Sequence, residues 1–211
     1  MPINILMLYN RSVTVIYPAG TGGEFFCWLM SQNAGFGALG VNLNADTNKW
    51  TLHTHTTPMH HHLLNVGIQF KEYKFHPDYI NIMRDHLMLD ADETQSFLQQ
   101  RYDCWSESLL VYLGPISDSS KQLTMTLRDQ KLKGVSPGIK VFDKSLEKFQ
   151  QAVGNRKTLI VDNSVLLSEP AEKLTEVYQT IASHFSIKST VFPQTVGSFL
   201  EFWRSKNNIH H

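Results

Sequence analysis

The order of apolar and polar runs along the chain predicts β-strands that alternate with amphipathic helices. Short apolar or β-branched runs, typical of buried strands, occupy residues 13–17, 79–83 and 158–161. Apolar residues at helical spacing fill residues 24–30, 90–113, 142–153 and 170–185. Strands and helices in alternation imply a mainly parallel sheet with helices on both faces. The predicted fold class is therefore α/β.

The stretches between these elements have the composition of turns and loops. Glycine recurs through residues 34–40, and residues 42–48 are polar, so both stretches predict connections. Residues 49–55 alternate in the way that suits a strand, and Pro58 stops it. The polar residues 117–138 fit either a mobile loop over a site or a helix and loop on the outside.

Length and charge limit the organisation of the protein and its partners. A chain of 211 residues suffices for one well-packed domain. We expect a single domain over residues 1–211, with residues 117–138 as a lid or insertion. Nineteen basic and nineteen acidic residues cancel, so no overall field favours nucleic acid or an anionic membrane. Recognition of an anion must be local, and the oligomeric state stays open.

Cysteine usage and the amino terminus indicate a cytoplasmic protein. Cys27 and Cys104 both lie in apolar helical patterns and are expected to be buried thiols, not a disulfide. The apolar residues at the amino terminus are interrupted by the polar residues 10–12. Neither a signal peptide nor a membrane span is expected.

The most informative stretch is the glycine-rich loop between the first buried strand and the first helix. It consists of Pro18, Ala19, Gly20, Thr21, Gly22 and Gly23, and Glu24 opens the helix. Glycine tolerates positive φ and lets other groups approach its backbone. Where such a loop opens a helix, free amide N–H groups and the positive end of the helix dipole converge. The loop therefore predicts a site for a phosphate or a sulfate.

The same loop also has a simpler interpretation, because three glycines in four residues can serve a tight turn alone. The ATPase loop pattern G-x-x-x-x-G-K-[ST] is absent, and the loop contains no lysine. The Glu24 carboxylate suits the helix dipole but would repel a bound anion. An anion would thus be held by main-chain N–H groups, without a neighbouring ammonium group.

Three stretches together resemble the sulfotransferase family. Tyr17, Pro18 and the glycine loop resemble the family's phosphosulfate-binding loop, Y-P-K-S-G-T-T-W or P-K-x-G-G-T. Residues 53–58 resemble its K-T-H-x-P segment, and residues 159–170 with the following helix are similar to its late V-x-Y-E-D-L…P…L…I unit. Order and spacing agree across most of the chain outside residues 117–138.

The resemblance implies a P-loop-type three-layer α/β/α fold and a sulfonate transfer. The donor would be 3'-phosphoadenosine 5'-phosphosulfate and the acceptor a hydroxyl or amine of a small molecule or carbohydrate, with no metal. Residues 18–24 would bind the donor, through main-chain N–H groups at positions 20–23 and the Thr21 hydroxyl. His55 would be the base, because an imidazole with a pKa of about 6.5 is largely neutral at working pH.

Arg84 would be the second contact with the donor. With Asp85 it is expected at the carboxyl end of the strand at residues 79–83, where ligands bind in open parallel sheets. The resemblance assigns Arg84 to the 3'-phosphate, which a guanidinium can hold through two parallel N–H bonds. The family's serine eight residues further on is Asp92 here.

Two other departures from the family concern positive charge. The loop lysine is replaced by Ala19 or Gly20, according to the register chosen, and removal of that charge costs several kcal/mol at the leaving phosphate in related sites. His53 could replace the lysine in part when it is protonated. The late basic motif that closes over the nucleotide is not visible, and Arg204 and Lys206 are interpreted as solvated surface residues.

Two alternatives belong to other functional classes. His53, His55 and residues 60–62 place five imidazoles within ten residues, and a pair at i and i+2 on a strand shares one face, as a zinc site requires. No Cys, Asp or Glu of the same segment completes a ligand set, so a polar loop explains them as well. The other alternative keeps the fold without the chemistry, as a non-catalytic nucleotide- or carbohydrate-binding protein.

Overall fold

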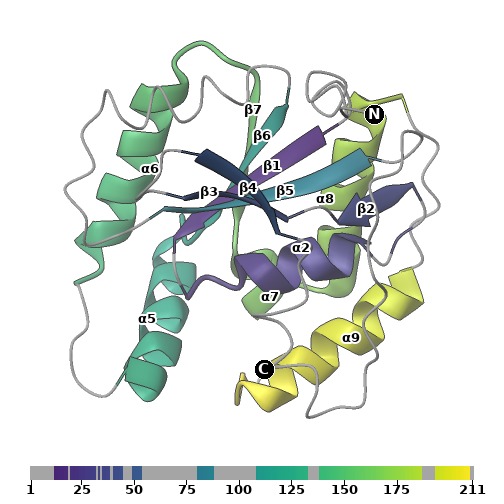
Figure 1. The fold of residues 1–211 in the computed structure, drawn as a ribbon. Helices are drawn as coiled ribbons and strands as arrows, with labels where there is room; N and C mark the ends of the chain where they lie inside the picture. Colours follow the sequence, from purple (N-terminus) through teal and green to yellow (C-terminus); the bar gives the residue numbers. More distant parts are fainter. Residues whose placement is uncertain are drawn as a thin grey trace, which may run out of the picture.

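The main sheet has five parallel strands in the order β2-β5-β1-β6-β7. This computed structural model describes residues 12–18, 20–31, 33, 35–38, 40–44, 49–53, 80–87, 108–132, 138–186 and 193–209. The strands are β1 (Ser12–Pro18), β2 (Phe36–Ala38), β5 (Ile80–Leu87), β6 (Leu109–Gly114) and β7 (Thr158–Asp162). The predicted α/β class with a mainly parallel sheet is confirmed (Figure 1).

Strand β1 is the centre of this sheet. It pairs with β5 on one side and β6 on the other, and all seven of its residues are buried. A parallel strand that is covered on both faces needs a continuous apolar run, which explains why residues 13–17 predicted it. The carboxyl ends of β1, β5, β6 and β7 share one edge, and the glycine loop follows directly from Pro18 at that edge.

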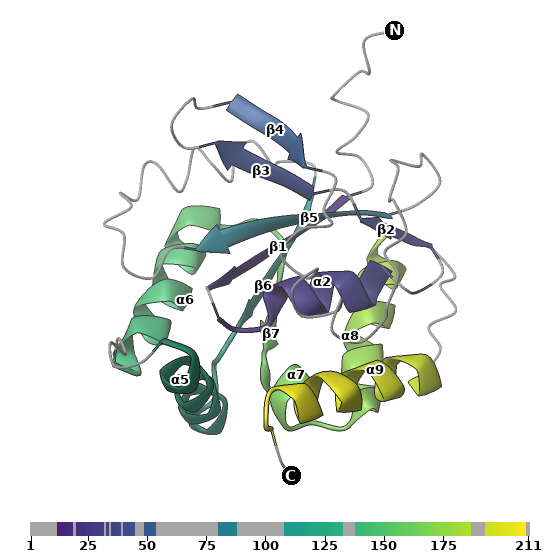
Figure 2. The same ribbon diagram turned by 60° about the horizontal axis from the view of Figure 1, so that its bottom comes forward.

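Helices cover both faces of the sheet, as expected for a three-layer α/β/α fold. Helices α2 (Gly23–Ser31), α8 (Ala171–His184) and α9 (Pro193–Lys206) share one apolar cluster with Val13, Val15 and Tyr17 of β1. Alternate strand residues face the other way. There the ring of Tyr112 packs against Phe149 of α6 (Lys140–Val153), with ring centroids 5.0 Å apart. Figure 2 shows α6 on the side of the sheet opposite to α2, α8 and α9.

Most of the polar stretch at residues 117–138 is a helix. Helix α5 (Asp118–Leu132) begins just after β6 and contacts the short helix α7 (Ser164–Leu167). Of the two alternatives left by the sequence, the helix is therefore correct for residues 118–132. Among the side chains of α5 whose burial is described, the buried ones are polar, namely Ser120, Lys121, Thr124 and Arg128.

Two predicted loops contain strands. Residues 36–38 form β2, which is paired with β5, and β3 (Gly40–Asn44) pairs antiparallel with β4 (Lys49–His53) in a separate two-stranded sheet beside β5. The prediction of loops at 34–40 and 42–48 was thus wrong over these strands. Glycine and asparagine weaken a strand, but pairing with a neighbouring strand overrides that preference at a sheet edge. The strand predicted from residue 49 is confirmed over residues 49–53.

The predicted end of the long helix at residues 90–113 was also wrong. Residues 109–114 form β6, which lies between β1 and β7, and each of them is buried. Leu109 and Leu113 have helical spacing only because every position of this strand is apolar or small. A short apolar run fits a buried strand and a helix equally well until its neighbours are known. Residues 88–107 lie outside the described part.

Two further expectations about strands need correction. Arg84 and Asp85 are not at the carboxyl end of their strand, because β5 continues to Leu87, where it pairs with Pro18. Arg84 instead lies in register with Val15. The run at residues 158–161 forms a strand as predicted, but β7 is the edge of the sheet and Ile160 is 39% exposed. Val161 is the one buried residue of β7, because no further strand pairs with β7 in the described sheet.

Arg204 is not a solvated surface residue. It is buried in α9, where its Nε donates to the carbonyl oxygen of Leu166 at 2.8 Å and an Nη donates to that of Glu169. Carbonyl groups at the ends of α7 and in the turn before α8 lack helical partners, so a guanidinium can satisfy two of them at once. Arg204 thus ties the last helix to the turn between α7 and α8.

Two smaller expectations were tested in part. Cys27 is a buried thiol outside any disulfide, as predicted, whereas Cys104 lies outside the described residues. Across the described residues, no helix combines the length and the apolar character that a membrane crossing needs.

We expect Arg204→Met to lower the free energy of unfolding by about 2 kcal/mol, since it keeps the apolar stem but leaves the carbonyl groups of Leu166 and Glu169 without a charged donor. Lys206→Met on the same helix should change it by less than about 1 kcal/mol, because Lys206 is exposed and its Nζ lies 5.6 Å from the centroid of the Phe202 ring. Urea denaturation of both variants measures the difference. Equal losses would show that the carbonyl contacts of Arg204 do not hold α9.

Candidate functional site

The loop between β1 and α2 requires glycine at three positions. Gly20 and Gly22 have φ values of 82° and 85°, which side chains rarely tolerate. Gly23 has ordinary φ but packs on Tyr17, and a Cβ there would lie 2.0 Å from the ring. The loop therefore turns sharply twice and then begins α2 directly against the strand.

The loop is partly held by its own hydrogen bonds. The Thr21 hydroxyl donates to the carbonyl oxygen of Pro18 at 2.8 Å, and the Thr21 N–H donates to the same oxygen at 3.3 Å. The hydroxyl hydrogen that was expected to face an anion is thus used inside the loop. The N–H groups in the first turn of α2 have no acceptor within the helix, so they are the loop's contribution to an anion site.

The two sides of the loop differ in character. A Cβ on Gly22 would lie 2.9 Å from Leu166 of α7 and 3.4 Å from Trp203 of α9. The Trp203 ring is also stacked on Phe25 of α2, with centroids 4.7 Å apart. Gly20, by contrast, is exposed. The Gly22 side is therefore lined by apolar groups, and Gly20 is the more accessible side of the loop.

A guanidinium borders the open side of the loop. The Cβ position of Gly20 lies 3.2 Å from Cγ, 3.5 Å from Cδ and 3.9 Å from Nη1 of Arg128 on α5. Arg128 is only 7% exposed. The sequence predicted an anion held by main-chain N–H groups without an ammonium group, and the structure adds the guanidinium of Arg128 beside the loop. The sequence held no local signal for Arg128, because 108 positions (128 − 20) separate it from Gly20.

Asn163 connects α5 to the loop. It is fully buried just after β7, and its N–H donates to the carbonyl oxygen of Gly114 at 3.0 Å. Its Nδ2 donates to Thr124 Oγ1 of α5 at 2.9 Å and to the carbonyl oxygen of Thr21 at 3.3 Å. One amide thus touches the glycine loop, the helix that carries Arg128 and the end of β6.

The Asp162 carboxylate fixes the beginnings of two helices. It accepts from the N–H groups of Ser117 at 2.8 Å and Ser164 at 3.1 Å, which lie at the starts of α5 and α7. Burial raises the pKa of this carboxyl, but hydrogen bonds from Ser120 and Ser117 and from these N–H groups outweigh it and hold the pKa below its ordinary value. Asp162 is therefore ionised when α5 is in place.

The structure describes the other predicted site residues only in part, or not at all. Glu24 lies in the first turn of α2 and is partly exposed. Arg84 is in β5 and His53 ends β4, both with only their backbone described, while Ala19 and His55 lie outside the described residues. Within the described ranges, no three His, Cys, Asp or Glu side chains gather in a way that could hold a metal ion. Residues 60–62 of the histidine cluster lie outside those ranges.

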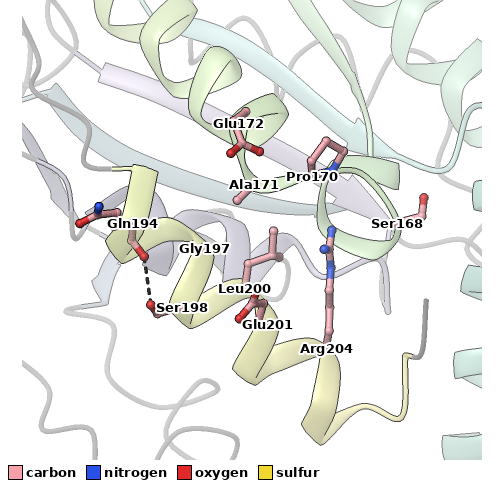
Figure 3. A pocket seen from close by; sticks show the side chains of 10 residues that line it. All are labelled: Ser168, Pro170, Ala171, Glu172, Gln194, Gly197, Ser198, Leu200, Glu201 and Arg204. Carbon is pink, nitrogen blue, oxygen red and sulfur yellow. Dashed lines mark hydrogen bonds between the residues drawn. The ribbon is translucent and has the colours of Figure 1, made fainter.

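A hollow of about 650 Å³ lies between the start of α8 and helix α9, away from the glycine loop (Figure 3). None of the predicted donor-binding residues lines it. Glu172 and Glu201 place two carboxylates there, and the Arg204 guanidinium is occupied by the carbonyl groups of Leu166 and Glu169. This hollow does not suit an anion, so the glycine loop remains the candidate site.

Two solved structures are similar to this chain at low identity. A gluconokinase from Sinorhizobium meliloti 1021 is 13% identical, with a TM-score of 0.39 and coverage of 92% of this chain and 97% of its own. A sulfotransferase from Alicyclobacillus acidocaldarius is 6% identical, with a TM-score of 0.46 and coverage of 94% of each chain. No family model and no curated protein matches the sequence. The fold assignment rests on the strand order of this chain, and these likenesses assign no activity.

We expect Asp162→Asn to lower the free energy of unfolding by about 1 to 2 kcal/mol at pH 7. The amide that replaces the carboxylate has one acceptor oxygen and no charge, so it cannot accept the N–H groups of Ser117 and Ser164 as the carboxylate does. The pKa of the Asp162 carboxyl is lowered by folding, so its stabilisation is complete above the ordinary pKa near 4. It is lost as the pH falls through the lower folded-state pKa.

Denaturation curves of both proteins between pH 7 and pH 3 measure this effect, and the difference between them should shrink at the acid end. Asp129→Asn removes the same charge from an exposed position on α5 and should change stability by less than about 0.5 kcal/mol. A gap between wild type and Asp162→Asn that stays constant over the whole pH range would contradict the capping role.

Proposed function

We propose that this protein is a nucleotide-dependent transferase that binds the phosphosulfate end of 3'-phosphoadenosine 5'-phosphosulfate at the glycine loop. The observation that carries the proposal is the loop itself, where two positive-φ glycines turn a buried parallel strand into a helix. The first N–H groups of a helix have no acceptor within the helix and point at such a loop. The loop lies at the carboxyl edge of the sheet, where open α/β folds bind ligands. The resemblance of residues 17–23 to the sulfotransferase loop supplies the chemistry.

In the proposed reaction, an acceptor hydroxyl or amine attacks the donor's sulfur atom. The bond between that sulfur and the bridging oxygen breaks as the new bond forms. 3'-Phosphoadenosine 5'-phosphate leaves with the bridging oxygen and the electron pair of the broken bond. The acceptor loses a proton, which His55 would take as general base. The N–H groups of the loop would stabilise the charge that develops on the leaving phosphate.

The roles of the remaining residues follow from the resemblance. Arg84 would hold the 3'-phosphate from β5, next to the strand that leads into the loop. His53 would contribute positive charge when protonated. The acceptor would be a small molecule or a carbohydrate, and the proposed chemistry needs no metal.

Addition of 3'-phosphoadenosine 5'-phosphate at 100 times its dissociation constant should raise the melting temperature by about 5 to 10 °C. Gly20→Ala should abolish most of that rise, because a side chain at this φ is strained and would press on the Arg128 stem. Gly154→Ala is the matched control, since Gly154 also has positive φ (56°) but no atom within 4 Å of its Cβ position.

The control variant should melt earlier than wild type but keep the full ligand-induced rise. A rise that survives in Gly20→Ala would place the ligand elsewhere. Stabilisation that responds to a chelator, and not to the nucleotide, would support the histidine metal site in place of this proposal. Scanning fluorimetry provides all these readings on one plate.

His55→Ala should abolish transfer of labelled sulfonate while the stabilisation by 3'-phosphoadenosine 5'-phosphate stays unchanged, because the imidazole acts on the acceptor and not on the product nucleotide. Single-turnover assays with a panel of hydroxyl and amine acceptors measure the first effect. Nucleotide binding without turnover in the wild type would instead identify a non-catalytic nucleotide-binding protein.

A further inference from the structure

We propose that Arg128 of α5 supplies the positive charge that the glycine loop lacks, and that its guanidinium contacts the anionic end of the donor beside Gly20. This inference rests on the proposed function, because it names the cation that a phosphosulfate would meet in the loop. It also makes α5 part of the site, although the sequence suggested only a lid, an insertion or an external helix there.

The first observation is the character of the face that α5 buries. Ser120, Thr124 and Arg128 follow one another at intervals of four residues and are 0%, 1% and 7% exposed. Residues at this spacing share one side of a helix. Helix α6 buries phenylalanines on its inner side, at positions 142 and 149. Burial of hydroxyl and guanidinium groups is costly unless they meet polar partners, so α5 is docked on a polar junction and not on the apolar core.

The second observation is that the polar face of α5 ends, at Arg128, beside the glycine loop. The aliphatic stem of Arg128 packs along Gly20, with Cγ and Cδ 3.2 and 3.5 Å from the Cβ position, and Nη1 follows at 3.9 Å. Gly20 is the exposed glycine of the loop, while Gly22 faces Leu166 and Trp203. The guanidinium therefore borders the side on which an anion can enter.

The third observation is that α5 is held in place beside the loop. Asn163 joins Thr124, one turn before Arg128, to the carbonyl oxygen of Thr21. Further back on the helix, Lys121 Nζ lies 2.7 Å from Asp143 Oδ1 of α6. These contacts fix the helix, so the position of Arg128 over the loop does not depend on its long side chain alone.

Within the part of the chain that the structure describes, Asn163 also has an unsatisfied hydrogen-bond acceptor at the contact between the loop and α5. Its side chain is fully buried, and its Oδ1 has no hydrogen-bond donor among the described residues. Nearly all buried polar atoms have a partner, so an open acceptor at the point where loop and helix meet indicates that a further group belongs there. A donor nucleotide carries hydroxyl groups that could donate to it.

Arginine is suited to this position for two reasons. A guanidinium offers two parallel N–H bonds to a phosphate or sulfate, whereas a lysine offers a single point charge. Its charge would also offset the repulsion between a bound anion and the Glu24 carboxylate in the first turn of α2. The loop N–H groups and Arg128 would then hold the anion from two directions.

Isothermal titration with 3'-phosphoadenosine 5'-phosphate tests the inference. Arg128→Met, which keeps the apolar stem, should weaken binding by about 10- to 100-fold. Arg128→Lys should recover part of the loss. Lys144→Met removes one positive charge from an exposed position on α6 and should stay within about twofold of wild type. The binding of Arg128→Met should also depend less on salt than that of wild type, which a purely structural role would not produce.

The outcomes separate the two proposals. Wild-type affinity and salt dependence in a folded Arg128→Met would overturn the role of Arg128 and leave the proposed function standing. A wild-type protein that binds no 3'-phosphoadenosine 5'-phosphate would overturn both. If circular dichroism shows that Arg128→Met does not fold, Arg128→Gln, which keeps hydrogen-bond donors without the charge, takes its place in the same comparison.

Discussion

The hydrogen bonds at the end of β7 hold the site together. Asp162 accepts from the first N–H groups of α5 and α7, and Asn163 joins α5 to the glycine loop. Two consecutive side chains at one strand end thus position three separate elements. Because β7 is itself in register with β6, and β6 with β1, these elements are fixed relative to the strand that leads into the loop.

The loop has apolar neighbours on one side and polar neighbours on the other. On one side Trp203 and Leu166 close the space over Gly22, and Arg204 anchors that helix to backbone carbonyl groups. On the other side α5 brings a polar face and Arg128 to the exposed Gly20. Gly22 is therefore less exposed than Gly20, which stays accessible beside the polar face of α5. This asymmetry gives the candidate site a direction of entry.

Elements whose signals are local were predicted well. The strand at residues 13–17, the glycine loop and helix α2 are contiguous, so periodicity and glycine content sufficed for them. Helix α8 was predicted from its apolar face, which includes Leu174, Tyr178 and Ile181. Edge strand β2 and the strand β6 were missed, because pairing with β5 or β1 decides their conformation and the sequence of a single segment does not show its partners.

The sequence by itself determined that a buried strand runs into a glycine loop and a helix, since φ preference and apolar periodicity are properties of neighbouring residues. Only the tertiary structure decided what surrounds the loop. Arg128 and Asn163 come from distant segments and reach the loop through sheet order and helix docking, as Trp203 does on the other side. Nothing in the sequence distinguishes these three residues from others of their type, because burial and contact partners arise only when the chain is folded.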